Sequence, residues 1–84
     1  MSEEFFGFQS WLIDWFEVNV GEKLNPDIDL FSSQVLDSFQ LIILIEDIEM
    51  ELSCRFTQPL LQDQRLATIR GLAEIMATLS MKNG

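Results

Sequence analysis

Apolar residues recur at helical spacing in three segments of this 84-residue chain, and this periodicity restricts its fold more than any other feature. The segments span residues 3–18, 37–52 and 69–82, and none of them contains proline. Residues three and four positions apart lie on the same side of a helix, so each segment presents one apolar face. Pro59 suits the first turn of a further, short helix over residues 59–64. We therefore expect an all-α four-helix bundle around one core, in a single domain over residues 1–84.

The apolar faces define the candidate core. On the first helix the face consists of Phe5, Phe8, Leu12, Trp15 and Phe16, on the second of Leu41, Leu44, Ile45, Ile48 and Leu52, and on the last of Ile69, Leu72, Ala73, Ile75, Met76 and Leu79. Trp11 flanks the face of the first helix, and Phe6 and Ile13 lie on its opposite margin. We expect this margin to be a partly exposed apolar edge of the core.

Three residues mark where the helices begin and end, and a glycine lies inside the last helix. Gly21 suits the position just after the first helix. Asp37 and Thr68 are good N-cap residues for the second and the last helix. Gly71, inside the last helix, is either tolerated there or lets another backbone segment come close.

A long connection over residues 19–36 separates the first two helices. Its turn-forming residues are Asn25, Pro26 and Asp27, and Leu30 and Phe31 are expected to anchor it to the core. Asp27 and Asp29 could contact a divalent cation, but they do not have the spacing of a calcium-binding loop, and a solvated loop is the better interpretation. A connection of this length in so small a domain is usually functional or contains a helical turn.

Charge excludes one class of partner. The chain has 14 acidic and 5 basic residues and a net charge of −9, so it repels nucleic-acid backbones and attracts basic partners. Residues 1–52 have a net charge of −11, and residues 53–84 a net charge of +2. Four acids occupy the C-terminal half of the second helix, at Glu46, Asp47, Glu49 and Glu51. The helix dipole disfavours acids there, which suggests that they serve a function.

The composition also argues against an enzyme. The chain has no histidine and one cysteine, Cys54, so it has neither His-dependent nucleophilic catalysis nor a His- or thiolate-based metal site. We expect no catalytic residues and no metal. Cys54 and Phe56 should point inward from a short extended connector over residues 53–57.

Two features bear on localisation. The chain begins with the acidic sequence Met1-Ser2-Glu3-Glu4, whereas a secretory signal begins with positive charge. Its longest aliphatic run, residues 41–45, is far shorter than the roughly 20 residues of a membrane span. We therefore expect a cytoplasmic protein with no membrane partner.

Ser38 is the candidate functional residue. It follows the expected cap Asp37 in the first turn of the second helix. A phosphate ester on its hydroxyl would lie beside free backbone N–H groups and the positive end of the helix dipole. Serines are common in first turns, so the position alone is weak evidence of modification.

The sequence around Ser38 resembles the acyl carrier protein family. The resemblance rests on Leu30-Phe31, on Val35-Leu36-Asp37-Ser38-Phe39, on the following Leu41, Leu44, Ile45, Ile48 and Glu49, and on Thr68-Ile69-Arg70-Gly71-Leu72. It extends over about residues 5–80 and implies a bundle of acyl-carrier type, with a long loop between helices 1 and 2 and a short helix 3.

The resemblance implies a function for several residues. Ser38 would be the attachment site of 4′-phosphopantetheine, Asp37 would be recognised by a phosphopantetheinyl transferase, and the cofactor thiol would carry acyl groups as thioesters between enzymes of a fatty-acid, polyketide or specialised pathway. A monomer would dock on basic patches of acyl-loading and acyl-processing enzymes through Phe39, Ile43, Glu46, Asp47 and Glu49. Gln34 stands where many family members have glycine, and Ile42 and Ile43 make the second helix more apolar than usual, which favours a dedicated carrier of one pathway.

Two alternatives are compatible with the same sequence. An aminoacyl, D-alanyl or peptidyl carrier would share Ser38 and differ in its cargo. An unmodified helical interaction module would bind a partner through the acidic helix and an apolar patch around Phe6, Ile13 and Ile43.

Overall fold

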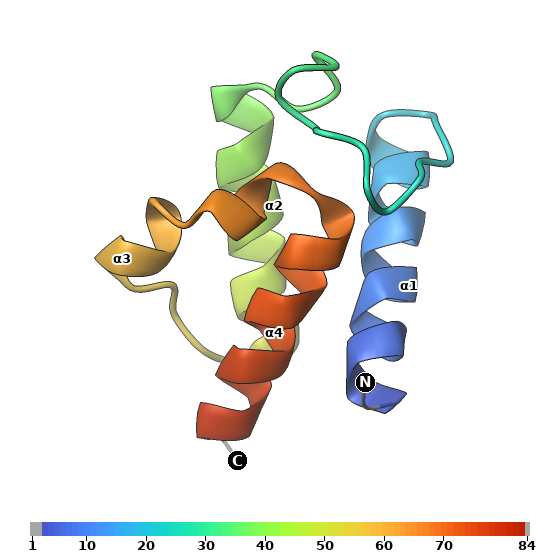
Figure 1. Cartoon of the computed structure of the whole chain (residues 1–84). Coiled ribbons are helices and arrows are strands. Elements are labelled where there is room, and N and C mark those ends of the chain that lie inside the picture. The colour runs from blue at the N-terminus through green and yellow to red at the C-terminus, as the bar shows by residue number, and fades with distance from the viewer. Residues whose placement is uncertain (1–2, 84) are drawn as a thin grey trace.

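The helical periodicity is borne out almost to the residue. The computed structural model describes residues 3–83, and its α-helices are α1 (Glu3–Asn19), α2 (Ser38–Leu52), α3 (Gln58–Leu61) and α4 (Ile69–Asn83) (Figure 1). A 3₁₀-helix, η1 (Gln64–Ala67), lies between α3 and α4. Within residues 3–83 there is no strand, which confirms the all-α prediction. Met1, Ser2 and Gly84 lie outside the described residues.

The third helix differs from its prediction. A single helix was expected over residues 59–64, but the chain forms one turn at α3 and then a separate turn at η1. The break is at Asp63, whose backbone is extended and whose carboxylate accepts a hydrogen bond from the Arg65 N–H at 2.8 Å. Asp63 thus begins a new turn as an N-cap instead of continuing the helix.

Three helix ends agree with the expected chemistry. The Asp37 side chain caps α2 by accepting from the Gln40 N–H at 2.8 Å. The Thr68 hydroxyl accepts from the Gly71 N–H at 2.9 Å at the start of α4. After α1 the backbone turns at Gly21, which has a φ of 86° and donates to the Phe16 and Glu17 carbonyls. These bonds satisfy backbone groups that the helices leave unpaired at their ends.

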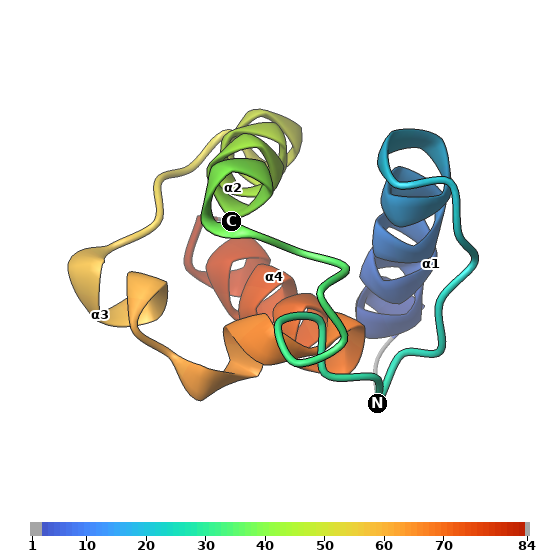
Figure 2. The same ribbon diagram turned by 90° about the horizontal axis from the view of Figure 1, so that it is seen from above.

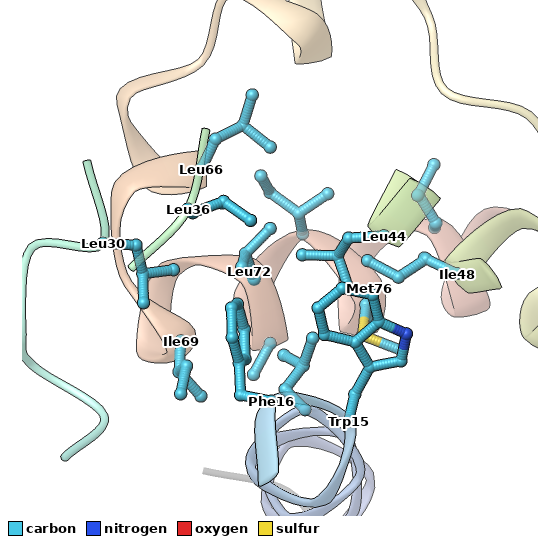
Figure 3. Close-up of a cluster of buried hydrophobic side chains, with 14 of the residues drawn as sticks. Trp15, Phe16, Leu30, Leu36, Leu44, Ile48, Leu66, Ile69, Leu72 and Met76 are labelled. Atoms are coloured by element: carbon cyan, nitrogen blue, oxygen red, sulfur yellow. The ribbon is translucent and has the colours of Figure 1, made fainter. Parts of the chain in front are cut away.

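Helix α4 lies at the centre of the core. Viewed from above, α1 and α2 stand on either side of it (Figure 2). The close-up in Figure 3 shows side chains of α1, α2 and α4, of η1 and of the loop between α1 and α2 converging on one cluster. The buried members are Phe5, Leu12, Trp15, Phe16, Leu30, Leu36, Leu44, Ile48, Leu66, Ile69, Leu72, Ala73, Ile75, Met76 and Leu79. Burial of this apolar surface drives the assembly of the bundle.

Gly71 is required by a close backbone approach. A Cβ atom placed on it would collide with the carbonyl group of Arg65 and would lie 2.8 Å from the Arg65 Cα atom. No side chain fits there unless η1 moves, because the obstacle is backbone. Of the two interpretations of Gly71, the close approach is correct.

The long loop is fastened to the beginning of α4. The Arg70 N–H donates to the Pro26 carbonyl at 3.0 Å, and the Leu30 N–H donates to the Ala67 carbonyl at 2.7 Å. The Arg70 guanidinium also binds both carboxylate oxygens of Asp27, at 2.6 and 3.0 Å. Both oxygens of Asp27 are therefore engaged in an ion pair with Arg70. This agrees with the interpretation of the segment as a solvated loop and gives no support to a cation site.

One helical turn inside the loop sets the direction of the chain toward α2. The Asp29 carboxylate accepts from the Phe31 and Ser32 N–H groups at 3.0 and 2.9 Å, and the Ser32 bond above all lowers its pKa. The turn ends at Gln34, which has a φ of 63°. The Val35 N–H reaches back to the carbonyl at position 30, as in the left-handed termination of a helix.

The anchoring of the loop was half correctly predicted. Leu30 and Leu36 are buried in the core cluster. Phe31, which was expected to share the role of Leu30, is 40% exposed instead. In one helical turn adjacent residues point about 100° apart, so Leu30 and Phe31 cannot both face the core.

Across residues 3–83, no helix combines the length and the apolar character that crossing a bilayer requires.

Replacing Gln34 with glycine should stabilise the fold. A left-handed conformation costs a non-glycine residue about 1–2 kcal/mol. Glycine avoids this cost but loses more backbone entropy on folding, so the Gln34→Gly substitution should add roughly 0.5–1 kcal/mol to the free energy of unfolding in urea. Ser32→Gly is the control, because Ser32 is not among the positive-φ residues, and it should destabilise the chain. A Gln34→Gly variant less stable than the wild type would contradict the backbone conformation described here.

The Asp27–Arg70 ion pair should make stability depend on acid. The Arg70 hydrogen bond lowers the pKa of Asp27 from its ordinary 3.8, so this group stabilises the fold above pH 3.8 and loses its effect as the pH falls through the lowered value. Asp27→Asn should therefore be less stable than the wild type at pH 7, and the difference should close below pH 3.8. Urea unfolding across this pH range measures it. Asp14→Asn, an exposed site with the same charge change, corrects for overall charge; the same pH dependence in both variants would refute the assignment.

Candidate functional site

Ser38 occupies the first position of α2, and its side chain is exposed. Asp37 precedes it with an extended backbone, and the Asp37 carbonyl accepts the first hydrogen bond of the helix, from the Leu41 N–H at 2.9 Å. The N–H groups of Ser38 and Phe39 come before this bond, so the helix itself gives them no acceptor. The hydroxyl thus lies at a helix N-terminus that favours negative charge.

The segment before Ser38 is held on both sides. Leu36 is buried in the core, and its N–H donates to the Leu30 carbonyl at 2.9 Å. On the other side, the Asp37 carboxylate is occupied by its capping bond to Gln40. The backbone around Ser38 therefore has a defined conformation, while the hydroxyl stays accessible to another molecule.

The outward face of α2 is apolar around one acid. We define this outward face by Phe39, Ile42, Glu46 and Met50, which follow helical spacing and are all exposed. Phe39 is 71% exposed and Met50 is 79% exposed, whereas Ile43 is half-buried at the margin. Phe39, Ile43 and Glu46 were predicted docking residues, whereas Ile42 and Met50 were not predicted to lie on this face. Their spacing from Phe39 was the signal that could have found them.

Asp47 links two helices. Its carboxylate accepts a hydrogen bond from the Trp15 indole N–H at 2.7 Å, and Trp15 is buried on α1. The bond satisfies the indole N–H of a buried aromatic side chain, a group that otherwise costs free energy to bury. One oxygen of a predicted docking residue is thus engaged inside the protein.

Glu49 organises the end of α2. Its carbonyl accepts from the N–H groups of Ser53 and Cys54, and its carboxylate accepts from the Phe56 N–H at 2.7 Å. Ser53 has a φ of 52°, so the helix ends in a left-handed residue. Glu49 fixes the connector to α3, and of the three predicted acidic docking residues Glu46 is the one with an exposed side chain.

A surface hollow of about 520 Å³ lies at the same end of α2. Its lining residues are Glu46, Glu49, Met50, Ser53, Cys54 and Arg55. Glu49 is eleven residues from Ser38, or about 16 Å along the helix axis, so the hollow does not adjoin the hydroxyl. Burial and the charge of Glu49 raise the pKa of the half-buried Cys54 thiol, which supports the interpretation of Cys54 as a packing residue.

The predicted patch around Phe6, Ile13 and Ile43 is not one surface. Trp15 faces α2, since it is bonded to Asp47 there. Ile13, two residues earlier, points about 200° away around the α1 axis, and Phe6 lies on the same side as Ile13. Phe6 and Ile13 are therefore separated from Ile43 by the body of α1.

Comparisons with known proteins leave the function open. No protein-family model, no curated protein and no solved structure matches the chain. Among residues 3–83, no three His, Cys, Asp or Glu side chains come together as a metal site. The function is therefore inferred from Ser38, its surroundings and the outward face of α2.

Removing the Glu49 carboxylate should weaken the fold. Glu49→Ala leaves the half-buried Phe56 N–H without its acceptor, and bonds to charged groups are worth about 1.5–3 kcal/mol. We expect the free energy of unfolding in urea to fall by about 1.5 kcal/mol or more. Glu46→Ala removes the same charge from an exposed side chain and should change it by less than about 0.5 kcal/mol. If the two substitutions changed the free energy of unfolding equally, the bond from Glu49 to the Phe56 N–H would not stabilise the fold.

Proposed function

We propose that this protein is a discrete acyl carrier protein in which Ser38 receives 4′-phosphopantetheine from coenzyme A through a separate phosphopantetheinyl transferase. One observation carries the proposal: the exposed hydroxyl of Ser38 at the first position of α2, directly after the Asp37 cap. The resemblance of the surrounding sequence to acyl carrier proteins gives this position its meaning. The protein itself would not be an enzyme.

The residues at the site fit a phosphodiester. The Ser38 and Phe39 N–H groups have no acceptor within the helix, and the positive end of the α2 dipole lies at the same place. The Asp37 carboxylate accepts from Gln40 and so is held in place by the backbone at the start of the helix. Attachment needs no rearrangement of the core, since Ser38 is exposed.

The position of Ser38 at the start of α2 assigns separate roles to the cofactor and to the protein. When bound, the cofactor supplies the thiol that carries acyl groups as thioesters. Ser38 supplies the attachment oxygen, Asp37 supplies an exposed acid beside it for the transferase to recognise, and the core holds both at the end of a rigid helix. The chain needs no base or nucleophile of its own, which agrees with its lack of histidine.

The loop before the site is compatible with the resemblance on which the proposal rests. Gln34 adopts a left-handed backbone, with a φ of 63°. Many members of the family that the sequence resembles have glycine at this position. Glycine is the residue that adopts a left-handed conformation without strain, so one turn geometry suits both residues.

Partner enzymes would dock on the outward face of α2. Phe39 lies next to Ser38, and Glu46 offers a free carboxylate to a basic patch on an acyl-loading or acyl-processing enzyme. Asp47 and Glu49 already bind Trp15 and Phe56, so their part in docking would be smaller than the sequence suggested. Exposed charge contacts are weak and sensitive to salt, which suits a cytoplasmic monomer that must leave each enzyme in turn.

Two other functions share parts of this surface. An aminoacyl, D-alanyl or peptidyl carrier would use Ser38 in the same way with another cargo, and loading assays with acyl and amino acids distinguish the two. An unmodified interaction module is favoured by the exposure of Phe39, Ile42 and Met50. Its binding would be indifferent to Ser38→Ala.

Modification of Ser38 is directly measurable. After incubation with coenzyme A and a broad-specificity phosphopantetheinyl transferase, intact-mass spectrometry should show one added phosphopantetheine arm on the wild type. Ser38→Ala should gain none. Ser32→Ala, which removes an exposed hydroxyl from the preceding loop, should be modified like the wild type. A folded wild type that several transferases leave unmodified, or a mass gain in Ser38→Ala, would refute the proposal.

A further inference from the structure

The hydrogen bond between Trp15 and Asp47 joins α1 to α2 at 2.7 Å. The two helices run in opposite directions, since α1 ends and α2 begins at the same end of the molecule (Figure 1). Figure 2 shows α1 and α2 on either side of α4, so the surface that both helices border faces away from α4. We call this surface, on either side of the Trp15–Asp47 bond, the α1–α2 seam.

Apolar side chains are arranged symmetrically about this bond. On α1, Trp11 lies four residues before Trp15 and Val18 three residues after it. On α2, Ile43 and Met50 have the same spacing from Asp47. Residues three and four apart share a face, so these four side chains form the apolar part of the seam. In the antiparallel arrangement Trp11 is opposite Met50 and Val18 is opposite Ile43.

The seam is exposed and hollowed. Val18 is 82% exposed and Met50 is 79% exposed, while Trp11 and Ile43 are half-buried beside them. On the α1 side a surface hollow of about 230 Å³ is lined by Trp11, Asp14, Trp15, Val18 and Asn19. Val18 and Met50 are apolar and largely exposed on the same seam, which indicates an interaction surface.

Each apolar row has acidic groups at its middle. Asp14 lies between Trp11 and Val18, and Glu46 lies beside Asp47 between Ile43 and Met50. Asp14 and Glu46 are both exposed. The segments that form α1 and α2 contain no lysine or arginine, and Arg55, which lines the hollow at the end of α2 with Glu46, is the nearest base to this row on the α2 side. No base of α1 or α2 lies beside Asp14, so a partner with positive charge complements the seam.

The dimensions favour a helix as the partner. Each apolar pair spans seven residues, which is about 10.5 Å along a helix. A helix laid in the seam presents apolar side chains at positions i and i+7 over the same distance, with a position between them for a base. A second copy of this chain is unsuited, because it would oppose acids with acids and its net charge is −9.

We infer that the α1–α2 seam binds a basic amphipathic helix of a partner protein. Its apolar side chains cover Trp11, Val18, Ile43 and Met50, and a lysine or arginine between them meets Asp14 and Glu46. This surface goes beyond the proposed carrier function, because it exists whether or not Ser38 is modified.

A synthetic helix tests the inference. The probe is a 14-residue amphipathic peptide of leucine and lysine without tryptophan. Both tryptophans of the protein, Trp11 and Trp15, border the seam and give the signal. We expect saturable binding of one peptide, with tryptophan emission shifting to shorter wavelength as the peptide covers the hollow. The Ser38→Ala variant should bind equally, so a failure of the carrier proposal would leave this result unchanged.

Charge-matched variants separate the seam from general attraction. The double variant Val18→Lys, Met50→Lys should bind the peptide at least about tenfold more weakly. The control Phe6→Lys, Met81→Lys makes the same charge change at exposed apolar sites outside the seam and should stay within about twofold of the wild type. All four sites are exposed, and circular dichroism checks that the helices persist.

Three results would overturn the inference. Equal weakening in both double variants would mean that only the overall charge attracts the peptide. Met50 also belongs to the outward face of α2, so the single variant Val18→Lys, on α1, separates the two surfaces. Loss of binding in Phe39→Lys, Ile42→Lys but not in Val18→Lys would place the peptide on the outward face of α2. Absence of binding by a wild type that sediments as a dimer would assign the seam to a second copy.

Discussion

The first turn of α4 fixes every segment that leads to Ser38. The Arg70 N–H ties it to the long loop at Pro26, the Arg70 side chain adds the Asp27 ion pair, and just before this turn the carbonyl of Ala67, at the end of η1, binds the Leu30 N–H. Gly71 allows the Arg65 backbone to lie directly against the same turn. Because Leu30 in turn accepts the N–H groups that close the helical turn before Leu36, the start of α2 is set by contacts made about 30 residues later in the chain. Loss of this turn would free the loop and with it the position of Ser38.

Local chemistry predicted those parts of the fold that depend on near neighbours. The helical faces, the Asp37 and Thr68 caps and the turn at Gly21 each involve residues within four or five positions, and each has the expected form. The division of the third helix was missed because Asp63 competes with helix continuation through one side-chain bond that a periodicity argument does not weigh. Phe31 was misplaced for a related reason, since the sequence showed an apolar pair but not the helical turn that separates its members.

The acidic end of α2 shows where sequence reasoning stops. Four acids near a helix C-terminus oppose the dipole, which in the sequence alone is a sign of function. The structure gives two of them internal partners: Asp47 binds Trp15, 32 residues away, and Glu49 binds the Phe56 backbone. Such partners depend on the tertiary fold, so the spacing of residues along the helix does not predict them. The unfavourable placement is thus partly offset by structure, and Glu46 keeps the stronger claim to a role in recognition.

The acids disfavour direct packing of α1 against α2. Neither segment contains a base, so close packing of the two helices would bring like charges together in a partly desolvated place. Both helices pack on α4 instead, and the Trp15–Asp47 bond lets one carboxylate lie between them with a donor beside it. This arrangement leaves Val18 and Met50 uncovered. A cationic helix would relieve both problems at once, because it screens the repulsion and buries the apolar rows. Asp47 is nine residues from Ser38, about 13.5 Å along α2, so a partner centred on the seam would leave the hydroxyl open.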